Sequence, residues 1–392
     1  MIHWSSSSIF RSFGFSNLVG WLRLPEVASF PAPVDGPLAW HHLGGGGFTS
    51  LAERYAGSRR IMPSGVRLSS VGANAPEEPP ALPGDMESLY HVPVMPREVV
   101  EWINPEPGKL LMDCTFGGGG HTRRMLAGGA GVLALDRDAD AMGQAQELSE
   151  DWPEDLVPLR TSFDHYPEIL SEAGVYGVDG ILMDVGVSSW QIDSPNRGFS
   201  FRFDGPLDMR MDRDAPLTAA DIVNAWTVEE LTRIFFDYGE ERASRRVAQA
   251  IEKRRAVKTI MTTGQLAELV ATVIPKHSGQ HPAAKIFQAL RIAVNDELGC
   301  LERALAEAHH WLRPGGRLVV LTFHSLEDRL VKNYMRRHSE PFVDRPEWPA
   351  PRPNTECHYR LPVRKAITAS DAEQRDNPRS RCARLRVAER IS

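Results

Sequence analysis

The residues best suited to ligand chemistry lie in one short stretch, Asp113-Cys114-Thr115-Phe116-Gly117-Gly118-Gly119-Gly120-His121. The apolar residues before it predict a strand, its glycines predict a turn that a ligand can approach closely, and the amphipathic segment 121–126 predicts a helix. A second apolar segment, 131–135, ends in Asp136. Asp136 follows Asp113, at the end of the first strand, by about 20 residues. This is the spacing at which an acidic residue binds ribose hydroxyls in a βαβ nucleotide site.

The glycines do not complete the dinucleotide fingerprint G-x-G-x-x-G. Counted from Gly117 the third glycine position is Thr122, and counted from Gly118 it is Arg123. The third glycine allows close helix packing beside a pyrophosphate. We therefore expect a ligand without pyrophosphate, such as S-adenosylmethionine. An NAD-dependent oxidoreductase and a glycine-rich turn without a ligand remain the alternatives.

Composition narrows the classes of protein. The chain has 392 residues, 42 % of them hydrophobic, which predicts about two or three domains with real cores. It contains no apolar run of the roughly 18 to 20 residues that cross a membrane, so no membrane partner is expected. The four cysteines form no C-x-x-C pair, so neither a metal site nor a disulfide framework is predicted, and a reducing compartment is expected. The net charge of −6 argues against indiscriminate nucleic-acid binding.

Residues 1–88 differ from the rest in being rich in serine, glycine and proline, which predicts a poorly ordered extension. The segment has two interpretations, an organellar transit peptide or a leader in a bacterial protein. Its first 50 residues contain only two arginines, Arg11 and Arg23, and this favours the bacterial leader and a cytoplasmic location over organellar import.

Beyond the extension, short apolar strands alternate with helices, which predicts an α/β fold with a doubly wound, mostly parallel sheet. About 130 residues separate Asp184 from Gly316, far more than one crossover needs. A helical insertion at 192–284 is therefore expected, between a first part of the main domain at 89–191 and a second part at 285–392. Further strands are expected at 156–160, 178–183 and 316–323, and helices at 139–150, 228–236, 240–255, 263–274, 298–312 and 326–335.

Polar residues end several of the expected strands. Asp113, Asp136, Asp184 and the segment 322–325 each follow an apolar run. Ligands of doubly wound sheets bind at the carboxyl ends of the strands, so we expect these groups to meet in one crevice. Any single aspartate could instead cap a loop or a helix.

Ten blocks follow one another in the sequence: His91–Met95, Asp113–His121, Asp136–Asp138, Asp184–Ser189, Arg197–Phe201, Leu207–Met211, Tyr238–Glu241, His281–Ile292, Phe323–Arg329 and Asn377–Arg381. Together these blocks resemble the bacterial 16S rRNA (cytosine-N4)-methyltransferase family over about 90–392. Trp190 is a departure, because the family usually has proline before the glutamine that is here Gln191.

The resemblance implies a Rossmann-like class I methyltransferase that uses S-adenosylmethionine to N4-methylate a specific cytidine in the decoding region of 16S rRNA. The partner would be small-subunit rRNA or the assembled small ribosomal subunit, and the oligomeric state stays open. It further implies that Gly119, Gly120 and His121 bind the cofactor, Asp136 its ribose and Phe163 its adenine. Asp184 and Gln191 would bind the methionine end or line the target pocket. Phe163 could also be a core residue.

The exocyclic amine of cytosine is a poor nucleophile, so catalysis needs positioning and acceptors near the amine. DNA amino-methyltransferases place a Pro-Pro-aromatic motif after strand four, and this chain has Val185-Gly186-Val187 there, so DNA is disfavoured. Asp184, Ser188 and His324 are the candidate acceptors or proton carriers. His324 could instead begin the helix expected at 326–335.

RNA binding is expected from a basic run in the insertion, which opposes only Glu252. A solvated helix face is the alternative. Arginines of the tail 375–390 form a second basic edge, beside a strand-like segment at 383–387. A non-catalytic RNA-binding protein is disfavoured because Asp136 and Asp184 are both present. The basic run consists of Arg242, Arg245, Arg246, Lys253, Arg254, Arg255 and Lys258.

Overall fold

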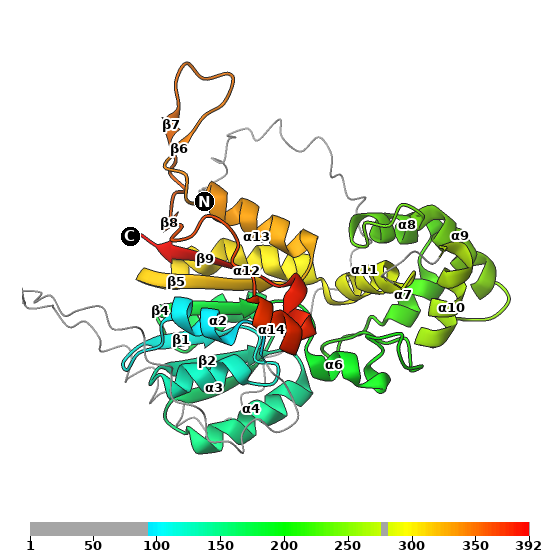
Figure 1. Cartoon of the computed structure of the whole chain (residues 1–392), viewed down its shortest axis with the longest axis horizontal. Helices are drawn as coiled ribbons and strands as arrows, with labels where there is room; N and C mark the ends of the chain where they lie inside the picture. Colours follow the sequence, from blue (N-terminus) through cyan, green and yellow to red (C-terminus); the bar gives the residue numbers. More distant parts are fainter. Residues whose placement is uncertain (1–92, 276–280, 392) are drawn as a thin grey trace, which may run out of the picture. The chain divides into compact units, whose positions relative to one another are not determined.

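The computed structural model describes residues 93–275 and 281–391, so the predictions made for 1–88 lie outside the described residues. The central element is a seven-stranded sheet in the order β3-β2-β1-β4-β5-β9-β8 (Figure 1). The first five strands are parallel, and β9 and β8 are added antiparallel at one edge. The strands are β1 (Leu110–Asp113), β2 (Gly131–Asp136), β3 (Leu156–Arg160), β4 (Val178–Asp184), β5 (Leu312–Thr322), β8 (Tyr359–Arg360) and β9 (Arg384–Arg390).

Alternate residues of the strands face opposite layers of helices. Leu111, Leu182 and Val319 belong to one buried cluster, whereas Leu110, Ile181 and Leu318 belong to another. Because side chains alternate across a strand, a strand apolar at every position must be covered on both faces. The first cluster is covered by α2 (Pro96–Ile103), α3 (Gly120–Ala127) and α4 (Ala139–Asp151), and the second by α5 (Tyr166–Glu172), α12 (Glu297–Trp311) and α13 (Ser325–Arg337).

The chain reverses direction in the sheet between β1 and β4, which are paired neighbours. It first moves outward from β1 through β2 to β3, and then returns to β4 and continues to β5. The sheet is therefore doubly wound, and the β1/β4 boundary is the switch point at which such folds bind ligands. This confirms the α/β, Rossmann-like fold expected from the sequence.

The segment between β4 and α12 forms a helical lobe with its own apolar core, which runs from Phe199 to Leu290. That core includes the first half of α11, so it extends beyond the boundary at residue 284 proposed from the sequence. The helix expected at 240–255 begins later, because Glu240 adopts a left-handed backbone with φ of 48°. The lobe contains α6 (Ser189–Asp193), α7 (Ala219–Ala225), α8 (Val228–Asp237), α9 (Ser244–Arg255), α10 (Thr263–Val273) and α11 (Ala284–Asn295), with a 3₁₀ turn, η3 (Pro195–Arg197).

The C-terminal segment returns to the sheet. Its last strand, β9, pairs along β5 from Arg317 with Glu389 to Thr322 with Arg384. A short hairpin precedes β9 in the chain. None of the described helices is long and apolar enough to span a membrane. The remaining elements are η2 (Phe163–His165), β6 (Phe342–Val343), β7 (Arg352–Pro353), α14 (Asp371–Asp376) and η4 (Pro378–Cys382).

Candidate active site

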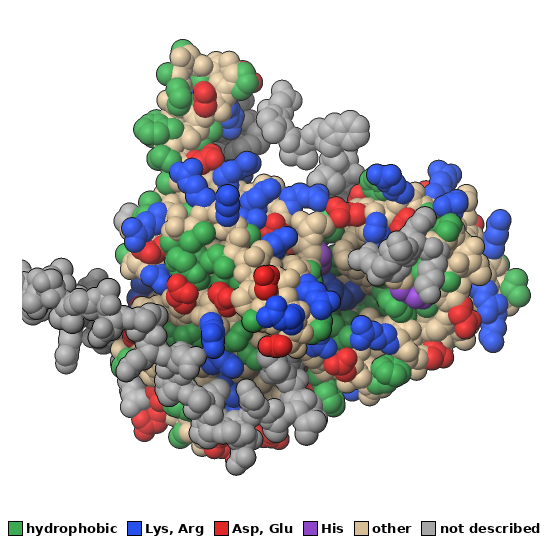
Figure 2. All heavy atoms as spheres, viewed as in Figure 1, with side chains coloured by type: hydrophobic (Ala, Val, Ile, Leu, Met, Phe, Trp, Pro, Cys, Tyr) green, Lys and Arg blue, Asp and Glu red, His purple; other side chains and the backbone are tan. Residues whose placement is uncertain are grey.

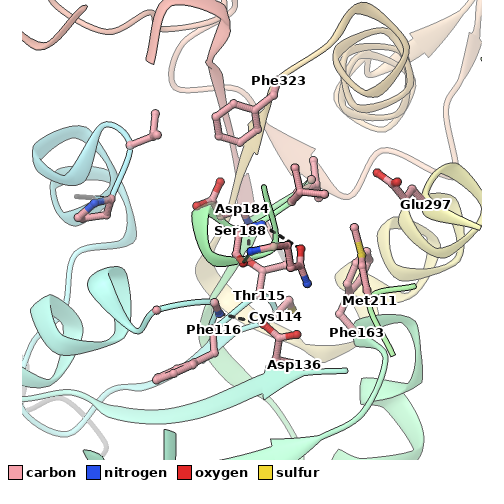
Figure 3. A pocket seen from close by; sticks show the side chains of 18 of the residues that line it. Cys114, Thr115, Phe116, Asp136, Phe163, Asp184, Ser188, Met211, Glu297 and Phe323 are labelled. Carbon is pink, nitrogen blue, oxygen red and sulfur yellow. Dashed lines mark hydrogen bonds between the residues drawn. The ribbon is translucent and has the colours of Figure 1, made fainter. Parts of the chain in front are cut away.

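A cavity of about 310 Å³ lies at the carboxyl ends of the parallel strands. It is lined by the glycine turn after β1, by Asp136 of β2, by the segment after β4 and by Phe323 after β5. Figure 3 shows Asp184 and Ser188 near its centre, with Asp136 and Phe323 on opposite sides. Of the groups that the sequence predicted to meet in one crevice, Asp136, Asp184 and Phe323 therefore line the same cavity.

The glycine turn is shaped by close backbone packing. Gly119 has φ of 73°, and a Cβ atom there would lie 2.6 Å from the Phe116 ring. A Cβ on Gly120 would lie 3.0 Å from Pro93. Gly117, Gly118 and Gly120 line the cavity, whereas Gly119 does not. Gly119 thus sets the path of the turn, since only glycine adopts a positive φ without strain in so little space.

Asp136 holds the glycine turn and faces the cavity. Its two carboxylate oxygens accept hydrogen bonds from the backbone N–H groups of Gly117 and Asp138, both at 2.9 Å. Burial raises the pKa of Asp136 to about 6, although these two hydrogen bonds act in the opposite direction. Each oxygen keeps a further lone pair, so the carboxylate can accept hydrogen bonds from a ligand hydroxyl as well.

Asp184 and His121 meet on the wall formed by β4 and α3. Nε2 of His121 lies 3.5 Å from Oδ2 of Asp184, and both imidazole nitrogens and Oδ1 of Asp184 are buried without a hydrogen-bond partner among the described residues. The Thr115 hydroxyl accepts the backbone N–H of Asp184 at 2.8 Å. Unpaired buried polar atoms cost stability unless something binds them. This wall is therefore suited to a cationic or hydrogen-bonding ligand group.

Ser188 and Gln191 form a capping box at the start of α6. The Gln191 amide also donates to Oδ2 of Asp138 at 2.7 Å, and Asp138 is paired with the buried Arg197 at 2.8 Å. Both capping residues line the cavity. This buried network therefore holds the polar side chains of Ser188 and Gln191 in place. Its Arg197 belongs to η3 of the helical lobe. Trp190, the departure from the family pattern, is exposed and donates to Asp140 at 3.3 Å.

Asp113 and Phe163 are both buried, but only Phe163 lines the cavity. Asp113 is buried outside the cavity lining, because its carboxylate accepts hydrogen bonds from the Thr122 hydroxyl and the Thr115 backbone N–H. It anchors α3 to β1 and does not contact the ligand space. Phe163 is 8 % exposed, belongs to the core under η2 and also lines the cavity. The core role and a ring contact with a ligand are thus compatible for Phe163.

His324 caps α13, and its ring Nδ1 accepts the Glu327 backbone N–H at 3.4 Å. His324 therefore begins this helix, as the alternative interpretation of the sequence held. Phe323 and Glu327 line the cavity, whereas His324 does not. Three further residues, Glu327, Arg291 and Glu297, also line the cavity, and none of them was a predicted site residue. They come from three different elements, and the only sequence signal was that Arg291 and Glu327 fall inside the family's motif blocks.

The donor set fits S-adenosylmethionine. A carboxylate with free lone pairs at the end of β2 suits ribose hydroxyls, and the Asp184 carboxylate in the cavity lining suits an ammonium group. No pyrophosphate is required by a turn that lacks the third glycine. The fold and the site together define a class I, S-adenosylmethionine-type methyltransferase.

The family model of the MraW methylase family matches residues 88–391. The chain therefore belongs to that family, the bacterial 16S rRNA (cytosine-N4)-methyltransferases that its motifs indicated, and it is an S-adenosylmethionine-dependent rRNA methyltransferase.

The similarity of this chain to solved structures is low. An rRNA methylase from Streptococcus thermophilus is 10 % identical with a TM-score of 0.34, covering 76 % of this chain and 94 % of its own. An S-adenosylmethionine-dependent O-methyltransferase from Thermotoga maritima is 10 % identical with a TM-score of 0.32, covering 79 % and 69 %. TrmN from Thermus thermophilus is 14 % identical with a TM-score of 0.33, covering 76 % and 48 %.

Proposed function

We propose that this protein transfers a methyl group to N4 of a specific cytidine in the decoding region of small-subunit rRNA. This proposal rests on one observation: a single cavity is lined both by the glycine turn and by the helical lobe. Asp136 and Gly117 line one part of it, and Met211 of the lobe lines another. A base extruded from its stack needs such a pocket beside the cofactor.

When bound, S-adenosylmethionine would supply an electrophilic methyl group on its sulfur, with S-adenosylhomocysteine as the leaving group, and the amine would give up one proton to an acceptor of this chain. We assign Gly120 and His121 to the cofactor, Asp136 to its ribose, Phe163 to its adenine, and Gln191 and Asp184 to its methionine end. Gly119 acts by setting the turn. These roles agree with the burial and the free lone pairs described above.

The chain's own contribution to the chemistry is positioning and proton acceptance. The lone pair of the cytosine amine is delocalised into the ring, so an acceptor that draws the amine out of plane favours attack. Asp184 and Ser188 lie together at the cavity centre (Figure 3) and are the candidate acceptors. His324 caps α13 and does not itself line the cavity, so its role in this proposal is to position Glu327.

The helical lobe provides a surface for RNA phosphates. Arg242, Arg245 and Arg246 are exposed on and beside α9, whose opposite face packs Val247 and Ile251 into the lobe core. Lys and Arg side chains are visible on the surface of this lobe (Figure 2). Arg255 is different, since it donates to the Val223 carbonyl at 2.7 Å and stabilises the lobe. The exposed members suit contacts that release counterions from RNA.

The direct test is nucleoside mass mapping of small-subunit rRNA from cells with and without the gene. The proposal predicts that N4-methylation of one decoding-region cytidine disappears with the gene. Purified protein should restore it on isolated rRNA or on assembled small subunits, and comparing the two identifies the substrate. We place this reaction in the bacterial cytoplasm, where rRNA is modified.

A further inference from the structure

Arg291, Glu297 and Glu327 form part of the cavity wall near Phe323, which follows β5. Arg291 of α11 donates from Nε and Nη2 to the two carboxylate oxygens of Glu297 at 2.7 and 2.8 Å. Glu327 of α13 is 1 % exposed and lies beside His324. In Figure 3 the Glu297 carboxylate points from α12 into the cavity.

The two carboxylate oxygens of Glu327 differ in their contacts. Its Oε2 accepts the backbone N–H groups of Phe323 and His324, which caps α13. Its Oε1 lies 2.9 Å from Nε2 of His324 without hydrogen-bond geometry, so both atoms are buried without a hydrogen-bond partner among the described residues. A buried carboxylate oxygen without a hydrogen bond is costly. Because Glu327 lines the cavity, a ligand bound there would lie beside this carboxylate.

Arg291 presents the complementary group. Its Nε and Nη2 are held by Glu297, which leaves Nη1 as a further donor on a guanidinium that lines the same cavity. The pairing with Glu297 also fixes the plane of the guanidinium. One wall therefore offers a positioned donor from α11 and a positioned acceptor from α13.

A divalent cation is a poorer occupant, although ligand atoms of Glu297, His324 and Glu327 lie within 4.8 Å of one another. Both oxygens of Glu297 already accept hydrogen bonds from Arg291, which supplies the counter-charge. A metal ion there would be repelled by the nearby guanidinium. A neutral ligand that both accepts and donates hydrogen bonds matches the wall better.

We propose that Arg291 and Glu327 read the Watson–Crick edge of the target cytosine and so determine its specificity. Arg291 Nη1 donates to the ring acceptors O2 or N3, and Glu327 Oε1 accepts a hydrogen from the exocyclic amine. Uracil presents an acceptor where cytosine has the amine, and would face the carboxylate with like polarity. This inference rests on the proposed function and assigns the base-recognising residues within it.

Glu327→Gln separates this role from helix capping. Glutamine keeps a carbonyl oxygen for the two capping N–H groups and replaces the free acceptor with a donor. The matched control is Glu230→Gln, because Glu230 has the same capping-box role on α8 away from the cavity. We expect Glu327→Gln to lower kcat/KM for small-subunit rRNA about 100-fold or more and to leave S-adenosylmethionine affinity unchanged. The control should behave as the parent protein.

A base analogue provides a readout that a structural role would not move. The probe is target RNA carrying a 2-pyrimidinone nucleoside, which lacks the 4-amino group, at the cytidine that the parent protein methylates. The parent should bind the cytidine RNA about tenfold more tightly than the analogue, and Glu327→Gln should lose that preference. Arg291→Lys should weaken both RNAs, whereas Arg337→Lys, at the ion pair with Glu356, should weaken neither.

The outcomes separate the two proposals. If the parent protein methylates the cytidine but Glu327→Gln keeps both its turnover and its preference for the amine, the base-recognition role is wrong and the proposed function stands. If the parent protein methylates no cytidine in small-subunit rRNA, the proposed function fails and this inference fails with it.

Discussion

Nε2 of His121 lies 3.5 Å from Oδ2 of Asp184, which joins the first turn of α3 to the end of β4. Oδ1 of Asp184 is buried without a hydrogen-bond partner among the described residues, and the Asp184 side chain lines the cavity. The cofactor ammonium and the cytosine amine are the two groups that could use this side chain. The assignment of Asp184 can therefore be tested by removing one group at a time.

Asp184→Asn should weaken S-adenosylhomocysteine at least tenfold, because a charge-assisted hydrogen bond to the ammonium contributes about 1.5 to 3 kcal/mol. Methylthioadenosine has no amino-acid part, so its affinity should stay unchanged. Isothermal calorimetry with both ligands measures the difference. Unchanged affinity for both ligands together with lost turnover would instead place Asp184 at the target base.

Asp136→Ala should weaken both of these ligands at least tenfold, since both contain the ribose. The affinity of the parent protein should also depend on pH. Ribose hydroxyls donate hydrogen bonds to the ionised carboxylate, and burial raises the pKa of Asp136 to about 6. Ligand affinity should therefore be full above about pH 6 and should fall as the pH drops through that value. Asp136→Asn should show little of this dependence. A pH-independent affinity in the parent would remove Asp136 from the ribose site.

Gly119→Ala should destabilise the fold by about 1 to 3 kcal/mol, because its φ of 73° and the Phe116 ring 2.6 Å from the new Cβ both oppose a side chain. The matched control is Gly143→Ala in the middle of α4, where a Cβ meets nothing within 4 Å. That control should stabilise by about 0.5 to 1 kcal/mol. Urea unfolding measures both, and equal effects would contradict the role given to the turn.

The strands and most helices could be predicted from the sequence because apolar periodicity reports burial directly. Asp136 and Asp184 could be located because strand ends in a doubly wound sheet meet at one edge. Asp113 was placed in the crevice by the same reasoning and lies outside it, since Thr122 one turn into α3 takes its carboxylate. Side-chain pairing of this kind leaves no periodic signal.

The joint between α11 and α12 shows a second limit. Asp296 adopts φ of 47° there, and the chain turns so that Arg291 and Glu297 form a bidentate pair across it. No helix was expected at 284–295, where the structure has α11. The partnership with Glu327 depends on the relative placement of three helices, which local sequence patterns do not determine.

Arg245→Ala combined with Arg246→Ala should weaken small-subunit RNA binding and leave cofactor affinity unchanged. Two lost phosphate contacts should lower the slope of log affinity against log salt by about 1 to 2. Arg336→Ala with Arg337→Ala is the matched control, since both arginines are exposed on α13. If the α9 variant binds as well as the parent at every salt concentration, α9 is only a solvated face and the arginines of the tail become the candidate RNA contacts.

The most direct measurement is a reaction of the purified protein with small-subunit rRNA and isotopically labelled S-adenosylmethionine, followed by mass mapping of the labelled nucleosides. The proposed function predicts a single labelled product, N4-methylcytidine, at one position of the decoding region. Label on the ring carbon, on a ribose hydroxyl or on another base, or no label on either free or assembled small-subunit rRNA, would contradict it.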